Sequence, residues 1–280
     1  MQWMPKLVAF GLLSFLLASF SEAKEYQWGL FAPNNLQEES KKWEELSKFI
    51  FNEKGDSVQF AAFPSEQELE KAVSAHQIDL AILRPHEFAA LKTNGQLQVI
   101  GTFVFNGQTH HFSHFVVGEK SSARKISDLK GKRLGLGKPS SASSYKIPMA
   151  ELKRLGIKPA KFFKSVREGL SHSDLELGVV RGELDVASNS SINRESLIKD
   201  GKLKSSDTRI IWTSEPIANE MLVGDAQLLA SAQGKKVMER VKLLFNEQVV
   251  SSQKQILPSP WTRLAPVPES GGDHAEKTPQ

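Results

Sequence analysis

Residues 128–157, DLKGKRLGLGKPSSASSYKIPMAELKRLGI, carry the pattern that decides the fold. The short apolar run at 132–137 predicts a strand, and the run at 144–157, which ends at Gly156, predicts a helix. The loop between them is crowded with hydroxyl groups: Ser140, Ser141, Ser143 and Ser144. A strand that leads through a short loop into a helix is the repeating unit of α/β domains, so this stretch predicts a sheet covered by helices.

The serine-rich loop allows two interpretations. The start of a helix leaves several backbone N–H groups without partners and carries about half a positive charge, so it can hold an anion. Serine hydroxyls would then add neutral donors to the same site. Alternatively, one serine caps the helix and the others belong to a solvated loop.

The same alternation extends over most of the chain. In the first block, strands are predicted at 27–33, 57–63, 78–85, 97–105 and 111–118, and helices at 36–54, 64–77 and 86–93. In the second, strands are predicted at 132–137, 162–166 and 184–190, and helices at 144–157 and 173–183. Strands at 208–216 and 219–224 and an amphipathic helix at 235–250 close the pattern. Alternation of this kind favours parallel sheets built from right-handed crossover units.

The two blocks are linked by strand-like stretches near 112–118 and 212–220. The sequence therefore predicts an α/β fold of two hinged lobes joined by two crossing strands, which can close around a ligand. We expect lobe I at 24–115 plus 218–257 and lobe II at 116–217.

The two ends of the chain differ in composition from the rest. Residues 1–23 hold an apolar run and finish on Ser21-Glu22-Ala23, a small-x-small cleavage pattern. This predicts a secretory signal peptide, since the run is too short to span a bilayer, with a buried core helix as the alternative. Residues 258–280 are rich in Pro, Gly, Ser and charge, which predicts a disordered or loosely docked tail. We therefore expect an exported protein.

Composition excludes several classes of protein. The chain has no cysteine, so it has neither disulfides nor thiolate metal sites, and no cofactor is expected. Its net charge of +4 comes from interspersed charges, which argues against nucleic-acid binding and suits an anionic ligand.

Three stretches together resemble a known family: DLKGKRLGLGKPSSASS (128–144), LKRLGI (152–157) and SHSDLELGVVRGELDVA (171–187). They look like the phosphonate-binding PhnD family of periplasmic substrate-binding proteins, and DLAILRPHEF (79–88) is consistent with it. The resemblance implies the type 2 periplasmic-binding-protein fold. It also implies capture of a phosphate, phosphite or phosphonate oxyanion in the periplasm and delivery to an ABC permease in the inner membrane. The alternative is a ligand-sensing accessory protein of the same fold that signals to a membrane receptor without transport.

The resemblance also implies a set of ligand contacts. The family's Ser-Thr-Ser-Gly loop falls on Ser141, Ala142, Ser143 and Ser144, so the threonine is lost and one hydroxyl is gained. The family's histidine falls on His172, for which an exposed loop or helix-cap histidine is the alternative. The family's tyrosine falls near Phe88, behind Arg84-Pro85 in place of Gly-Pro.

Two further candidates follow from strand ends, where ligands collect in open α/β sheets. Arg84 ends one predicted strand and could bind an oxyanion through paired hydrogen bonds, or could form a salt bridge with Asp79. Asn189 ends another, and Asn34 and Asn35 follow the first strand.

Specific residues raise two other possible functions. His110, His111 and His114 invite a metal site, but no further ligands cluster in the sequence, and a solvated turn is the alternative. A serine hydrolase is disfavoured because no G-x-S-x-G pattern is present, so we expect no enzyme activity.

Overall fold

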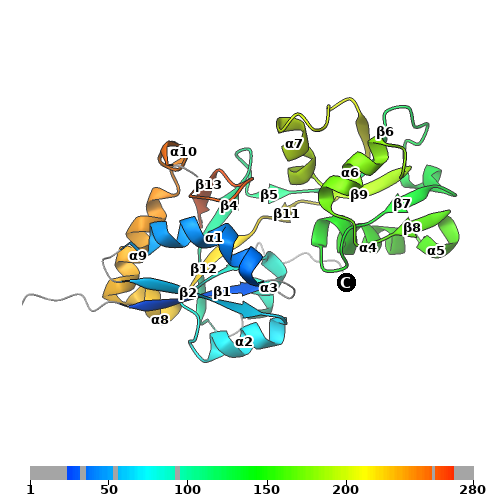
Figure 1. Cartoon of the computed structure of the whole chain (residues 1–280). Coiled ribbons are helices and arrows are strands. Elements are labelled where there is room, and N and C mark those ends of the chain that lie inside the picture. Colours follow the sequence, from blue (N-terminus) through cyan, green and yellow to red (C-terminus); the bar gives the residue numbers. More distant parts are fainter. Residues whose placement is uncertain (1–23, 32–35, 53–55, 92–94, 254–255, 268–280) are drawn as a thin grey trace, which may run out of the picture.

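The computed structural model of the protein describes most of the chain: residues 24–31, 36–52, 56–91, 95–253 and 256–267. The predicted signal peptide lies outside these ranges, as do Asn34, Asn35 and residues 268–280. Figure 1 shows two α/β lobes side by side, bridged by the short strands β5 (His110–His111) and β11 (Ile217–Ala218). The predicted two-lobed architecture with two crossing strands is confirmed.

The first lobe contains, within the described residues, a six-stranded sheet in the order β13-β4-β12-β3-β1-β2. Its strands are β1 (Glu25–Phe31), β2 (Ser57–Phe63), β3 (Leu80–Leu83), β4 (Leu97–Val104), β12 (Met221–Asp225) and β13 (Arg263–Pro266). β1 runs parallel to β2 and β3, whereas β12 and β13 run antiparallel to their neighbours. The expectation of purely parallel sheets was wrong because β12 enters directly from the hinge, without the crossover helix that parallel pairing needs.

Helices cover the sheet of the first lobe: α1 (Leu36–Ile50), α2 (Glu66–Ser74), α3 (Pro85–Leu91), α8 (Ala226–Ala230), α9 (Ala232–Leu243) and α10 (Glu247–Ser252). α1 lies within the helix predicted at 36–54, and its Trp43, Leu46 and Ile50 are all buried. They pack with Trp28 and Phe103 in one core cluster. Burying each such side chain contributes roughly 1.5–3 kcal/mol, which holds α1 on the sheet.

The helix predicted at 235–250 is interrupted. α9 ends at Leu243, and Asn246 begins α10 by accepting a hydrogen bond from the Gln248 backbone N–H at 2.9 Å. The Leu244 carbonyl instead accepts a hydrogen bond from the Leu264 N–H at 2.8 Å. The break therefore ties the helical end of the chain to β13.

The segment at 258–267 is ordered and not a loose tail, which corrects the prediction for this part of residues 258–280. Its strand β13 pairs with β4 from Arg263 to Pro266, and Leu264 is fully buried. The Trp261 ring lies 5.5 Å from the Phe103 ring, centroid to centroid. The composition of residues 258–280 as a whole did not indicate this strand, because Pro, Gly, Ser and charged residues outnumber its few apolar residues.

The second lobe has a five-stranded sheet in the part of the chain that is described, in the order β10-β6-β9-β7-β8. Its elements are β6 (Ser113–Gly118), η2 (Ile126–Leu129), β7 (Arg133–Gly135), η3 (Ala142–Lys146), α4 (Ile147–Arg154), α5 (Pro159–Phe162), β8 (Ser165–Arg167), α6 (His172–Val180), β9 (Val186–Ser190), α7 (Ser191–Lys199) and β10 (Thr208–Thr213). β7 is parallel to β8 and β9, and β6 is antiparallel to β9 and β10. The predicted lobe boundary at 115/116 falls inside β6, and the exact lobe limits stay a prediction.

The hinge strands are clamped by one buried amide. Asn219 donates from Nδ2 to the carbonyls of Phe103 (2.9 Å) and Gln108 (3.1 Å), and its backbone N–H donates to Thr109 at 2.8 Å. Its Oδ1 lies 2.9 Å from Nδ1 of His111. His110 and His111 are therefore part of a paired hinge strand, and the expectation of a solvated turn there was wrong.

Candidate functional site

The serine-rich loop leads from β7 into a π-helical turn, η3, which continues as α4. Ser141 occupies the N-cap, and its Oγ accepts hydrogen bonds from the Ser144 N–H (3.3 Å) and the Ser144 hydroxyl (2.8 Å). The hydroxyl proton of Ser141 is then free to point outward, because its oxygen already accepts twice. The capping interpretation is confirmed for Ser141, and the anion-holding interpretation stays a prediction.

The first turn of this helix leaves backbone donors unused. Its hydrogen bonds span five residues, from Lys146 N–H to the Ser141 carbonyl and from the Ile147 N–H to the Ala142 carbonyl. Among the described residues, nothing accepts a hydrogen bond from the backbone N–H of Ala142 or Ser143. The Ser143 hydroxyl is likewise without a described protein partner. These groups form a cluster of neutral donors of the kind that holds an anion.

The turn is held in place from beneath. Ser113 and Ser188 donate from their hydroxyls to the carbonyls of Ser143 and Ser144, each at 2.5 Å. Gly137 donates its N–H to the Ser144 carbonyl at 3.0 Å, and a Cβ at this glycine would collide with Ser144 Oγ. Because both neighbouring strands fix its carbonyls, the turn is rigid before any ligand arrives.

His172 lies beside this turn, at the start of α6. The backbone N–H groups of Gly169 and Leu170 donate to the carbonyls of Gly137 (3.0 Å) and Leu136 (3.2 Å). The chain segment just before His172 therefore lies alongside the start of the serine loop. The half-buried ring lies with Nδ1 2.8 Å from Asn189 Oδ1. Burial lowers the pKa of His172, and the hydrogen bond to Asn189 opposes part of that shift.

Asn189 is fully buried and stands behind His172. Its Nδ2 donates to Glu176 Oε2 (3.0 Å) and to the His172 carbonyl (3.2 Å), and its Oδ1 also accepts from the Ser190 N–H at 2.9 Å. Glu176 is in turn paired with Arg194 at 2.5 Å and accepts from Thr208. With both ends of its amide occupied, Asn189 orients His172, which differs from the direct ligand contact predicted for it.

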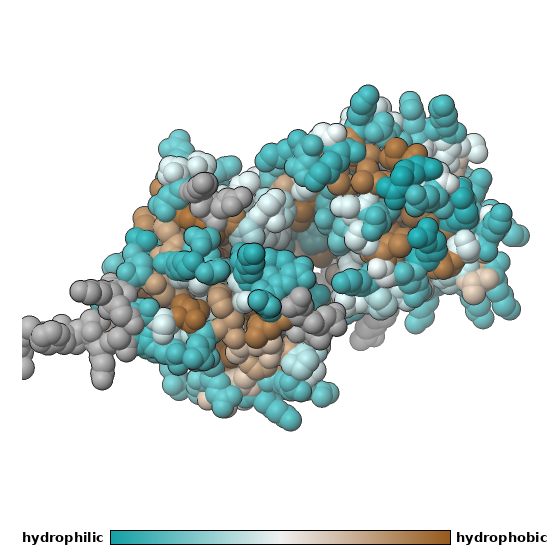
Figure 2. Space-filling model, in the orientation of Figure 1, coloured by the Kyte–Doolittle hydropathy of each residue, from teal (hydrophilic) through white to brown (hydrophobic). Residues whose placement is uncertain are grey.

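Arg84, in the first lobe, reaches the serine loop. It forms an ion pair with the buried Glu87, in which Nε donates to Oε1 at 2.8 Å and the backbone N–H donates to Oε2 at 2.7 Å. Asp79 was the wrong alternative partner, since it pairs with Lys24 at 2.9 Å. One guanidinium nitrogen of Arg84 lies 3.5 Å from the Ser140 carbonyl, across the interlobe gap. Figure 2 shows the molecular surface hollowed between the two lobes.

Phe88 lies on α3 in the first lobe and packs against the apolar cluster that includes Leu83 and Leu91. It is partly buried there. The structure gives this ring a packing role, and the ligand contact that the resemblance implies for it stays a prediction.

Two residues near the site were not expected there: Glu220 was missed by sequence reasoning, and His111 was considered only as a metal ligand. Burial lowers the pKa of His111, the Asn219 hydrogen bond opposes this, and nearby His172 lowers it further, which puts the hinge histidine close to the site. Burial raises the pKa of Glu220 to about 7, with Arg84 opposing and Glu87 reinforcing the shift. No sequence pattern links either residue to an oxyanion site, and only chain folding brings the hinge to the ends of β3 and β7.

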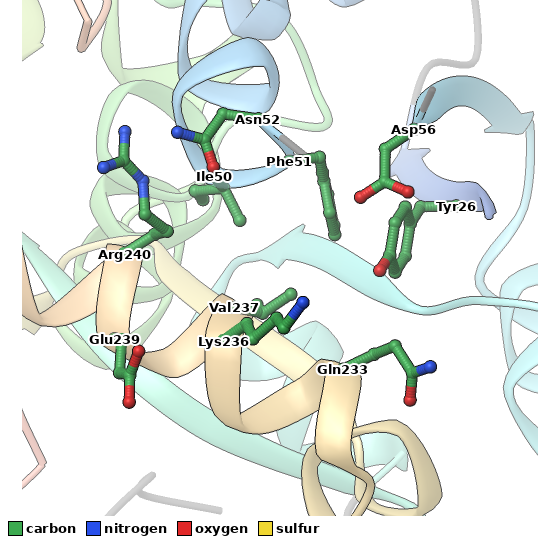
Figure 3. Close-up of a pocket in the computed structure, with 10 residues that line it drawn as sticks. All are labelled: Tyr26, Ile50, Phe51, Asn52, Asp56, Gln233, Lys236, Val237, Glu239 and Arg240. Carbon is green, nitrogen blue, oxygen red and sulfur yellow. The ribbon is translucent and has the colours of Figure 1, made fainter. Parts of the chain in front are cut away.

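The cavity shown in Figure 3 does not compete for this role. It has a volume of about 200 Å³ and is lined by the stacked rings of Tyr26 and Phe51, whose centroids are 4.0 Å apart, together with Asp56 and residues of α9. It lies at the start of β1 and the end of α1. Ligands of open α/β sheets gather at the opposite, carboxyl ends of the strands. The serine turn, His172 and Arg84 all lie at such ends.

None of the helices in the described part of the chain combines the length and apolar composition needed to cross a bilayer.

Similar folds are known in solved structures. A binding-protein component of an ABC phosphonate transporter from Pseudomonas aeruginosa matches with a TM-score of 0.60 and 18% identity, over 88% of this chain and 82% of that one. PhnD1 from Prochlorococcus marinus, solved with methylphosphonate, matches with a TM-score of 0.62 and 18% identity, over 88% and 93% of the two chains. These similarities establish the type 2 periplasmic-binding-protein fold predicted above.

Sequence comparison identifies the family. The phosphonates-binding periplasmic protein of Escherichia coli (strain K12) is 24% identical over 224 residues, which are 76% of this chain. The chain spans 65% of that relative's length. Residues 30–248 match the family described as the periplasmic substrate-binding protein of ABC phosphonate transporters. Members of this family are substrate-binding components of transporters. The chain belongs to this family of periplasmic phosphonate-binding proteins.

Proposed function

We propose that the protein captures a phosphate-, phosphite- or phosphonate-type oxyanion between its lobes and delivers it to an ABC permease. The observation that carries the proposal is the set of unused donors at the start of η3: the backbone N–H groups of Ala142 and Ser143 and the hydroxyls of Ser141 and Ser143. Fixed neutral donors in a site that excludes water bind an anion more strongly than mobile ones in solvent.

The comparisons support the same ligand class. A structure with this fold holds methylphosphonate, another is named as a binding-protein component of an ABC phosphonate transporter, and the curated relative is named as a phosphonates-binding protein. They give the sensory alternative no support. Residues 1–23 fit a signal peptide that would export the chain to the periplasm, where such a permease collects its substrate.

Closure would bring Arg84 onto the ligand or onto the loop that holds it. Its guanidinium is already neutralised by Glu87, so we expect it to hold the lobes together more than to supply net charge. The positive character of the site then comes mainly from the helix start and its hydroxyls.

The proposal is tested by calorimetry and thermal unfolding of residues 24–280 with phosphate, phosphite, methylphosphonate, 2-aminoethylphosphonate and sulfate. A ligand that binds only the folded protein stabilises it by about 4 kcal/mol at a thousandfold excess over Kd. Ser143→Ala removes a hydroxyl without a described protein partner, so we expect weaker binding with little change in stability. Ser140→Ala, at an exposed position of the same loop, is the matched control. If no phosphorus oxyanion binds the wild-type protein, the proposed function is wrong.

A further inference from the structure

Charge is distributed unevenly between the two lobes. Residues 120–168, which lie in the second lobe, hold fourteen Lys and Arg and three Asp and Glu. Residues 24–115, in the first lobe, hold eight Lys and Arg and twelve Asp and Glu. The interspersed charge of the chain as a whole therefore does not extend to the second lobe. A molecule with this separation of charge turns its basic end toward a negatively charged surface.

Six exposed cations of the second lobe gather at the amino ends of β7 and β8. The turn before β7 lies against the end of α5, because Gly131 donates its N–H to the Phe162 carbonyl at 2.8 Å and Lys164 donates to the Lys132 carbonyl at 2.9 Å. The chain runs from the last turn of α4 through α5 into β8 at the same place. We call this surface the basic face, and its exposed cations are Lys130, Lys153, Arg154, Lys158, Lys161 and Lys164.

The basic face is poorly neutralised by the rest of the chain. Within the described residues, its five lysines form no ion pair, and Arg154 pairs with Glu151 at 2.7 Å. No acidic residue occurs between Lys153 and Lys164. Lys158 and Lys161 are three residues apart at the start of α5, and like charges at this spacing repel each other. Because folding gains nothing from this cluster of cations, it points to a partner outside the chain.

An exposed apolar side chain lies among these cations. Leu155 directly follows α4 and is 43% exposed, whereas the nearby Ile157 and Phe162 pack partly against the core of the second lobe. Lysines around an exposed leucine suit the boundary of a bilayer, where the ammonium groups meet anionic headgroups and the leucine reaches the acyl chains.

We propose that the basic face adsorbs the protein on an anionic phospholipid surface, with Leu155 turned toward the acyl chains. The face holds five lysines and one arginine. Lysine is a flexible point charge, which suits the diffuse negative charge of a membrane, whereas the fork of arginine suits the fixed carboxylates of a protein partner. Figure 1 shows α5 at the end of the second lobe that faces away from the first, so this end can approach a flat surface. Each Lys or Arg near an anionic membrane strengthens adsorption about fivefold.

Adsorption leaves the proposed ligand site accessible. The serine turn follows the carboxyl end of β7, whereas the basic face lies at the amino end of the same strand. The inference therefore goes beyond oxyanion capture and does not depend on it. Adsorption would hold the protein at the membrane that contains its permease while the gap between the lobes stays open to solvent.

The test is co-sedimentation of residues 24–280 with lipid vesicles. These residues leave out the apolar run within residues 1–23, which would itself enter a bilayer. The protein should bind vesicles of phosphatidylglycerol and phosphatidylcholine in equal parts at about 20 mM salt, and should largely dissociate at about 300 mM salt because salt screens exposed charges. It should not bind vesicles of phosphatidylcholine alone. Equal binding to both kinds of vesicle, or no binding to the anionic ones, overturns the proposal.

Two variants with the same change in net charge test the assignment to the basic face. Lys158→Gln/Lys161→Gln should weaken adsorption about twentyfold. The matched control, Lys199→Gln/Lys204→Gln, removes two exposed lysines between the end of α7 and the start of β10, at the opposite edge of the same sheet. It should weaken adsorption less than about threefold. Equal losses in the two variants would show that only net charge matters, and would overturn the role of the basic face.

A second pair of variants tests the orientation on the bilayer. Leu155→Ala should weaken adsorption a few-fold, because less apolar surface reaches the acyl chains. Leu243→Ala, which changes a leucine of α9 that is 40% exposed in the first lobe, should leave adsorption unchanged. An effect at Leu243 as large as that at Leu155 would overturn the proposed orientation.

The remaining outcomes separate lipid adsorption from a protein partner and from oxyanion capture. Retention on immobilised polyglutamate without binding to anionic vesicles would assign the basic face to an acidic protein and overturn the lipid proposal. Calorimetry with methylphosphonate should give the same affinity for Lys158→Gln/Lys161→Gln as for the wild type. Absence of vesicle binding in a protein that still binds a phosphorus oxyanion refutes the adsorption alone. Vesicle binding without any oxyanion binding refutes only the proposed function.

Discussion

A guanidinium nitrogen of Arg84, at the end of β3, lies 3.5 Å from the carbonyl oxygen of Ser140, in the loop that follows β7. The two residues belong to different lobes, and the contact spans the gap in which the ligand is proposed to bind. The same side chain neutralises Glu87, whose carboxylate is almost fully buried. Arg84 thus links a buried charge in one lobe to the loop of the other.

Arg84→Ala should destabilise the first lobe by about 3 kcal/mol, because it leaves the buried Glu87 carboxylate without its cation. Chemical denaturation measures this change. Arg181→Ala, which breaks an exposed pair with Glu183, should cost less than about 1 kcal/mol and serves as the control. The double variant Arg84→Ala/Glu87→Ala should recover part of the loss, and equal stability of all these variants would contradict the ion-pair account.

His114 should make stability depend on pH. Burial lowers its pKa to about 4, with Arg194 adding to the shift, and its Nδ1 is buried without a described partner. Because the unfolded chain binds this proton more readily, stability should rise with pH from about 4 to about 6.5, by at most about 3 kcal/mol.

Denaturation of wild type and His114→Phe at several pH values measures that contribution as a difference. Between pH 4 and 6.5, the free energy of unfolding of the variant should rise less steeply with pH, by the equivalent of about one bound proton. Its stability near pH 7 should be unchanged. A variant whose pH profile overlays that of the wild type would show that His114 is not the titrating group.

Glu220 should make stability fall as the pH rises, which is the opposite of the effect of His114. Its pKa, raised to about 7 by burial, means that the folded state holds this proton more tightly than the unfolded chain. Its contribution to stability is fully present below about pH 4.5 and is lost as the pH rises through 7, at most about 3 kcal/mol. Glu220→Gln should therefore be more stable than wild type at pH 8 and similar to it at pH 4. The same or lower stability at pH 8 would contradict the raised pKa.

Leu264 should carry much of the stability that β13 contributes. The side chain is fully buried against the first core, so Leu264→Ala should cost about 2–5 kcal/mol. Val267→Ala, at an exposed neighbouring position, should change stability by less than about 0.5 kcal/mol. Chemical denaturation distinguishes the two, and a small effect at Leu264 would mean that the end of the chain is only loosely docked.

The sequence alone determined the local elements and the class of protein. The patterns at 36–54 and 64–77 predict helices, and α1 and α2 lie within these ranges. The sequence from Gly137 to Ser144 predicts a helix start with several hydroxyl groups. The surrounding residues resemble the family to which the chain belongs. These features are legible because backbone dihedrals and side-chain periodicity are set by neighbours in the chain.

Only the tertiary structure decided which distant groups meet. It paired Arg84 with Glu87 and not Asp79, moved Asn189 behind His172, and put Glu220 and His111 beside the site. It also made a strand of residues 263–266 by giving them β4 as a partner. Such choices depend on hydrogen-bond geometry and burial between residues far apart in sequence, and no local pattern records either quantity.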